Sequence, residues 1–202
     1  MAIDEQKIVD VVVRMNQQGD EEGIIDAFDV YLTNHYADYY NRISFRFEEE
    51  VRRNDAENLE IARALLIMSG HVCAFHTFDG ISRSDAWKAL IAPMCETPED
   101  RVRGIIAVVN AFGWGVWKAI EISPERLVLR IANSYESTGF LREFGRSDHS
   151  ECYLATGATA GLMNLFFTPG HDEQGLATGC FRATEIKCRC KGDPYCEFVV
   201  TR

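Results

Sequence analysis

The chain has 202 residues, of which 47% are hydrophobic and 26% charged, which predicts a globular protein of one domain with an added terminal segment. Its 31 acidic and 21 basic residues give a net charge of −10, which argues against nucleic-acid binding because phosphate recognition needs a cationic surface. Residues 1–60 carry 15 acids and 6 bases, so the N-terminal part holds most of the negative charge, and no apolar run reaches the ~20 residues of a membrane span.

Apolar residues at helical spacing predict that the first 112 residues are mainly helical. Thr97 followed by Pro98 is typical of a helix start, because threonine caps the first turn and proline fits its first position. Ser84 followed by Asp85 indicates another start. The predicted helices cover 8–15, 21–47, 56–78, 84–91 and 97–112, with a turn at Asp79–Gly80.

After residue 112 the apolar pattern changes, and segments 113–122 and 127–133 predict an antiparallel hairpin. A short helix over 135–144 and a small-residue helix over 152–167 follow, and Gly157 and Gly161 suit close packing of the second against a neighbour. Beyond a loop at 168–179, segments 180–188 and 195–201 predict a second hairpin. We therefore expect an α+β fold of helices packed on an antiparallel sheet built from two hairpins, with an N-terminal helical extension (1–60) before the main domain (61–202).

Cysteine is the most informative residue type, because five of the seven cysteines lie in the last 51 residues. The N-terminus lacks the cationic start and apolar core of a secretory signal, so we expect a cytoplasmic protein. In that reducing compartment, clustered cysteines indicate metal binding, catalysis or simple burial before disulfides.

Glu185, Cys188 and Cys196 are spaced so that two strands of a hairpin would bring them together. Cys152, at the start of the small-residue helix, is a candidate for a fourth ligand. Thiolates with one carboxylate suit a structural Zn²⁺ site closed by four protein ligands. Two alternatives stay open at this point: Cys190 could replace any one of the four, and all of them could be ordinary buried cysteines.

The stretch from Glu185 to Phe198 resembles the C-terminal signature of the 4-vinyl reductase domain family, and segments 135–145 and 152–161 match it upstream. That family includes sensor modules of phenol- and xylene-responsive transcription activators, and it shares its fold with subunits of a vesicle-tethering complex. The resemblance, which covers roughly residues 80–202, implies a structural zinc ion. Its implied ligands are Cys152, Glu185, Cys188 and Cys196. Ala132 stands at about the place where those sensors have a tryptophan that contacts the phenolic hydroxyl.

We also expect a mostly apolar pocket between the 114–133 hairpin and the preceding helices, with His76 as a polar anchor. The candidate ligand-binding residues are Phe75, His76, Phe78, Trp87, Ile106, Phe112, Trp114, Trp117 and Phe140. The expected ligand is a small hydrophobic or aromatic molecule.

Together these patterns favour a ligand-binding sensor domain over an enzyme, and we assign no catalytic residue. One alternative is an enzyme of the vinyl-reductase or thiazoline-ring-hydrolase type, although the sequence contains no flavin or nicotinamide motif. Another is a structural adaptor related in fold to the vesicle-tethering subunits. The amphipathic helices of residues 1–60 predict a homodimer with the 21–47 helix at its centre.

Overall fold

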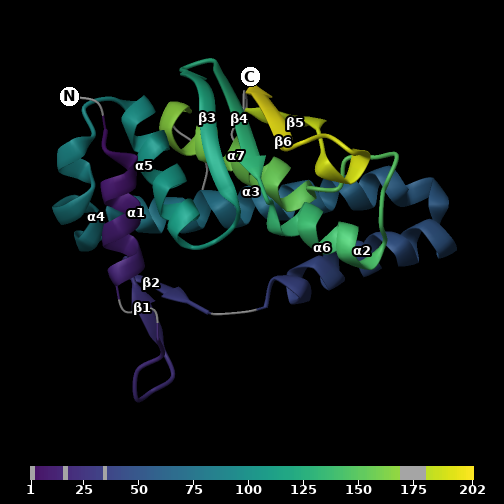
Figure 1. Cartoon of the computed structure of the whole chain (residues 1–202), viewed down its shortest axis with the longest axis horizontal. Coiled ribbons are helices and arrows are strands. Elements are labelled where there is room, and N and C mark those ends of the chain that lie inside the picture. Colours follow the sequence, from purple (N-terminus) through teal and green to yellow (C-terminus); the bar gives the residue numbers. More distant parts are fainter. Residues whose placement is uncertain (1–2, 16–17, 34–35, 169–180) are drawn as a thin grey trace.

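The computed structural model describes residues 3–15, 18–33, 36–168 and 181–202 (Figure 1), and within them it confirms the expected α+β class. A four-stranded antiparallel sheet has the strand order β3-β4-β6-β5, so the two predicted hairpins lie side by side. In chain order the elements are α1 (Glu5–Arg14), β1 (Ile25–Ala27), β2 (Val30–Leu32), α2 (Ala37–Asn54), η1 (Ala56–Asn58), α3 (Leu59–Arg83), α4 (Asp85–Leu90), η2 (Ala92–Met94), α5 (Pro98–Ala111), β3 (Val116–Ser123), β4 (Arg126–Ala132), α6 (Tyr135–Glu143), α7 (Tyr153–Phe167), β5 (Arg182–Lys187), η3 (Arg189–Lys191) and β6 (Cys196–Thr201).

The sheet buries one face against α5 and α7. Along β4, Leu127, Leu129 and Ile131 are fully buried and alternate with less buried residues, as expected for a strand with one face on the core. On its more exposed face, Glu197 of β6 pairs with Arg130 of β4 and with Lys187 of β5. The sheet therefore presents an apolar inner face to the helices and a charged outer face.

Helices α3 and α7 pack closely enough that only glycine fits at several contact points. A Cβ atom at Gly157 would lie 1.8 Å from the carbonyl oxygen of Ile67, and one at Gly70 would lie 2.2 Å from that of Leu154. The expected close packing of the small-residue helix is confirmed, and α3 is the neighbour that it contacts (Figure 1). This contact fixes the position of α7, and of Cys152 directly before it, relative to the sheet.

The prediction of one helix over 21–47 is wrong, because this region forms the β1–β2 hairpin and then α2. Phe28 and Asp29 adopt left-handed backbone conformations, which make a tight two-residue turn. Tertiary contacts stabilise that turn: the buried Phe28 ring packs edge-on against Phe112, with 6.4 Å between ring centroids, and the Asp29 carboxylate accepts a hydrogen bond from the backbone N–H of Asp85. These contacts come from distant parts of the chain and leave no local signal.

The predicted turn at Asp79–Gly80 is also wrong, because α3 continues to Arg83. Gly80 instead allows β2 to pack closely on α3. A Cβ atom at Gly80 would lie 2.6 Å from the side chain of Val30, which is too close for an ordinary contact. The predicted start of α4 is confirmed, because Ser84 accepts a hydrogen bond from the N–H of Trp87. The start of α5 is confirmed as well, by a reciprocal capping box between Thr97 and Asp100.

Helix α1 packs against α5, and its residues Ile8 and Val12 belong to the same hydrophobic core as the sheet. A domain boundary near residue 60 stays a prediction. The predicted loop at 168–179, from residue 169 onwards, lies outside the described residues, as do His35 and Cys180.

One helical stretch of the described residues, Ala56–Arg83, is long and apolar enough to cross a membrane by length and composition alone. The core helix of a globular protein meets the same two criteria. Because α3 packs along α7, part of its apolar surface is covered within the chain, whereas Ile61, Leu65 and Met68 are exposed.

Candidate metal centre

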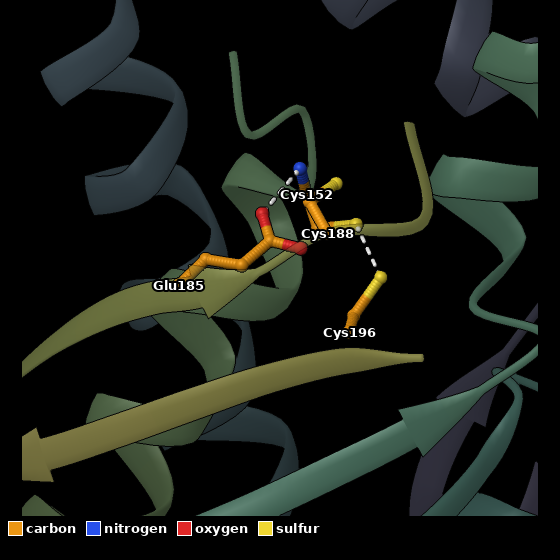
Figure 2. A group of neighbouring side chains, drawn as sticks. All are labelled: Cys152, Glu185, Cys188 and Cys196. Carbon is orange, nitrogen blue, oxygen red and sulfur yellow. Dashed lines mark hydrogen bonds between the residues drawn. The ribbon is translucent and has the colours of Figure 1, made fainter. Parts of the chain in front are cut away.

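Four residues from three parts of the chain converge at the end of the second hairpin (Figure 2). Cys152 directly precedes α7, Glu185 lies near the end of β5, Cys188 follows that strand, and Cys196 begins β6. Because β5 and β6 are paired and antiparallel, the end of one strand meets the beginning of the next. The potential ligand atoms of the four side chains all lie within 4.8 Å of one another, so this group could hold a metal ion.

The sulfur geometry fits a metal better than a disulfide. The Sγ atoms of Cys152 and Cys196 are 3.5 Å apart, whereas a disulfide would hold them at about 2.0 Å. A tetrahedral ion with Zn–S bonds of about 2.3 Å places two sulfur ligands about 3.8 Å apart. The observed separation is close to that value, and both thiols are completely buried.

Glu185 provides a second observation in favour of a cation. One of its carboxylate oxygens, Oε2, accepts a hydrogen bond of 3.1 Å from the backbone N–H of Cys152. The other, Oε1, is buried and has no hydrogen-bond partner among the described residues. Burial raises the pKa of Glu185 to about 9. Because native proteins rarely leave a buried carboxylate oxygen without a partner, this oxygen fits the role of a metal ligand.

The thiols themselves have contrasting environments. Burial raises the pKa of the Cys152 thiol well above its ordinary value. A hydrogen bond from Cys152, followed by contributions from Cys190 and Cys196, lowers the pKa of Cys188. Metals bind cysteine as the thiolate, and the lowered pKa of Cys188 is compatible with such a role.

Neighbouring groups that sequence analysis missed support the four candidate ligands. Glu136 is 1% exposed, and its carboxylate accepts hydrogen bonds of 3.0 and 2.8 Å from the N–H groups of Leu154 and Ala155, which fixes the start of α7. The Asp193 carboxylate accepts a 2.9 Å hydrogen bond from the N–H of Cys188. The Asp–Pro pair in the turn before Cys196 was a sequence signal for the contact between Asp193 and Cys188. The contacts of Glu136 had no such signal, because they depend on how α6 packs against α7.

Cys190 lies outside the group of four. It belongs to η3, is fully buried, and its Sγ atom is 3.8 Å from the carbonyl oxygen of Ser137. Because the chain turns into η3 directly after Cys188, the two cysteines do not follow the alternation of an extended strand. The geometry therefore favours Cys152, Glu185, Cys188 and Cys196 as the ligand set.

The structure places the nine predicted pocket residues at different depths. Phe75, Phe78, Trp87, Ile106 and Trp117 are buried, Phe112, Trp114 and Phe140 are half-buried, and His76 is exposed. The ring of Trp114 lies 6.5 Å from that of Trp117 and 6.1 Å from that of Tyr135, measured between centroids. The indole N–H of Trp117 is buried and has no hydrogen-bond acceptor among the described residues.

Comparison with solved structures supports the fold, whereas the sequence comparisons found no match. No family model matches the sequence, and no curated protein matches it. The structure resembles the phenol-responsive sensory domain of the transcription activator PoxR, solved with phenol, at a TM-score of 0.72 and 12% identity, covering 100% of this chain and 91% of that one. It also resembles trafficking protein particle complex subunit 3 from Naegleria fowleri, solved covalently bound to palmitic acid. This match has a TM-score of 0.54 and 12% identity, and it covers 82% of this chain and 93% of that one. At such identities the likeness establishes the fold alone.

Two surface cavities of the described residues are lined by side chains of α2 and α6, and they include only Phe140 of the predicted pocket residues. The first, of about 340 Å³, is bounded by Phe140 of the predicted set together with Phe45 and Glu48 of α2. The second, of about 300 Å³, lies between the start of α2, one side of α6 and Arg189 of η3. Neither cavity has a signal in the sequence, because both depend on where α2 packs.

Proposed function

We propose that this chain is a cytoplasmic small-molecule-binding sensor domain, stabilised by a structural zinc ion on Cys152, Glu185, Cys188 and Cys196. The observation that carries ligand binding is the indole N–H of Trp117, which has no acceptor in the described part of the chain. This side chain is 2% exposed and shares a hydrophobic core with Phe78 and Ile106, which are also predicted pocket residues. A buried donor without an acceptor costs ~1–3 kcal/mol, and a ligand with a polar atom in an apolar pocket would remove that cost.

The ligand class follows from the same surroundings. Aromatic and aliphatic side chains around Trp117 suit a small hydrophobic or aromatic molecule with one hydrogen-bond acceptor. The fold shared with a phenol-responsive sensory domain supports this class. The resemblance of segment 185–198 to the 4-vinyl reductase domain family supports it as well.

Phenol and toluene test the role of Trp117, because they have similar shapes and only phenol carries a hydrogen-bonding oxygen. We expect the indole N–H resonance of Trp117 to shift in NMR spectra on addition of phenol. Trp117→Phe should weaken phenol binding about tenfold, which corresponds to one lost hydrogen bond in a buried site, and should leave toluene binding nearly unchanged. Trp114→Phe is the matched control. Equal effects of Trp117→Phe on both compounds, or no binding of either compound, would contradict this assignment.

We also propose a homodimer formed through the exposed face of α2. Tyr36, immediately before α2, is 89% exposed, and the helix exposes Tyr39, Ile43 and Phe47 along the same side at 53%, 52% and 40%. An apolar stripe of this length on one helix is typical of a protein interface. With the 21–47 prediction corrected, the centre of this interface is α2 alone.

Light scattering tests the dimer directly. The intact chain should have twice its own mass, and Ile43→Arg should give a monomer because it places a charge in the middle of the stripe. Ile186→Arg is the control, since Ile186 is 47% exposed on β5, in a different part of the fold. A monomeric intact chain at micromolar concentrations would refute the dimer. The same stripe would then favour the adaptor alternative, in which another protein covers α2.

A further inference from the structure

The second cavity has a charge pattern that the proposed sensor function does not use. Its volume of about 300 Å³ is at the lower end of the range for small-molecule sites. Three charged side chains line it: Asp38 in the first turn of α2, Arg142 of α6 and Arg189 of η3. The lining therefore combines two positive groups with one negative group.

Neither arginine is neutralised by a carboxylate among the described residues. Among the described residues Arg142 forms no ion pair, and the Arg189 side chain donates a 3.0 Å hydrogen bond to the hydroxyl of Thr138. By contrast, the arginines of α2 that pair with glutamates include Arg46, Arg52 and Arg53. In a chain with a net charge of −10, two arginines that share a cavity and form no ion pair among the described residues are unexpected, and they favour an anionic ligand.

Asn41 adds an acceptor that lacks a donor. Its side chain is 3% exposed and lines the same cavity. The amide Nδ2 donates a 3.1 Å hydrogen bond to the carbonyl oxygen of Tyr135, which orients the amide, while Oδ1 has no partner among the described residues. Gly139 makes room for this arrangement, because a Cβ atom there would lie 1.9 Å from Nδ2. The cavity thus offers two acceptors, Asn41 Oδ1 and the Asp38 carboxylate, for a ligand that donates hydrogen bonds.

We propose that this cavity binds an acidic amino acid. The two carboxylates of such a ligand match Arg142 and Arg189, and its ammonium group matches Asp38 and Oδ1 of Asn41. Guanidinium and carboxylate groups form strong paired hydrogen bonds, so each arginine can hold one carboxylate. The ligand's charges would be −, − and +, opposite to those of the lining. This proposal is independent of the proposed ligand site at Trp117 and of the proposed zinc site.

Isothermal titration calorimetry of the full chain with L-glutamate tests the proposal. We expect saturable binding of L-glutamate, and binding about tenfold weaker for glutarate, which lacks the ammonium group, and for L-glutamine, which lacks the second carboxylate. Absence of saturable heat with L-glutamate would overturn the proposal. Glutarate or inorganic phosphate binding as tightly as L-glutamate would also overturn it, because the cavity would then be a general anion site.

Three variants locate the binding within the cavity. Arg142→Gln should weaken L-glutamate binding about tenfold or more, and it should fold normally because Arg142 is exposed. Asp38→Asn should weaken L-glutamate but keep or strengthen glutarate, since it removes a repulsive charge. Arg146→Gln, an exposed arginine at the other cavity, is the control and should change nothing. Unchanged binding in Arg142→Gln would overturn the assignment, and the response of Trp117 to phenol should persist in all three variants.

Discussion

Cys196→Ser is expected to reduce bound zinc from about one ion per chain to nearly none and to lower the melting temperature strongly. Cys196 is fully buried, and its Sγ atom lies 3.5 Å from that of Cys152, so its loss removes one ligand and disturbs the geometry of the others. Structural zinc contributes on the order of 10 kcal/mol to the folding of small zinc domains, and loss of even part of that would exceed the effect of most single substitutions. Elemental analysis by mass spectrometry and a thermal melt measure the two effects.

The other cysteines provide matched controls for this prediction. Cys73→Ser and Cys95→Ser should leave zinc content unchanged, because Cys73 is exposed and neither belongs to the group of four. Cys190→Ser should also retain zinc, although it alters a buried residue. A wild-type chain that contains no metal and whose melting temperature does not change with added zinc or a chelator would refute the metal centre.

Gly157→Ala should lower the melting temperature by ~5–10 °C. Helix propensity alone predicts a higher melting temperature, because alanine is about 1 kcal/mol more favourable than glycine within a helix. The packing decides the result: the new Cβ atom would lie 1.8 Å from the carbonyl oxygen of Ile67 and 2.5 Å from the backbone nitrogen of His71. Since those are backbone atoms, α3 and α7 would have to move apart, at a cost of ~3 kcal/mol or more.

Gly19→Ala is the control for this substitution. The heavy atom nearest to the new Cβ atom would lie 3.5 Å from it, which is an ordinary contact. The free energy of unfolding should therefore change by less than ~0.5 kcal/mol. Differential scanning calorimetry measures both variants. If Gly157→Ala melts at or above the wild-type temperature, the close contact between α3 and α7 is wrong.

The sequence predicted the parts of the fold that depend on local signals. The hairpins around residues 123–126 and 188–195 followed from alternating apolar residues and turn residues, and the cap of α5 followed from Thr97 and Pro98. The spacing of Glu185, Cys188 and Cys196 across a hairpin was sufficient to bring them together, because strand pairing fixes which residues meet. Cys152 was identified from its place before a small-residue helix, whose position depends on Gly157.

What the sequence did not predict depends on contacts between distant segments. The apolar residues of 24–32 have helical spacing, yet Phe28 is buried beside Phe112 and the backbone turns there. Gly80 suggested a turn, although its function is to let Val30 approach α3. Asn41 gave no signal in the sequence, since the lack of a donor for its oxygen, among the residues that the structure describes, becomes evident only once α2 is packed against α6.

X-ray absorption at the zinc K-edge of the full chain tests the metal centre most directly, because it reports the number and type of atoms bound to the ion. The four candidate ligands predict three sulfur atoms at about 2.3 Å and one oxygen at about 2.0–2.2 Å. Four sulfur ligands would mean that Cys190 replaces Glu185, and a spectrum of hydrated zinc without sulfur ligands would mean that the cysteines are merely buried. Either result would contradict the centre formed by Cys152, Glu185, Cys188 and Cys196.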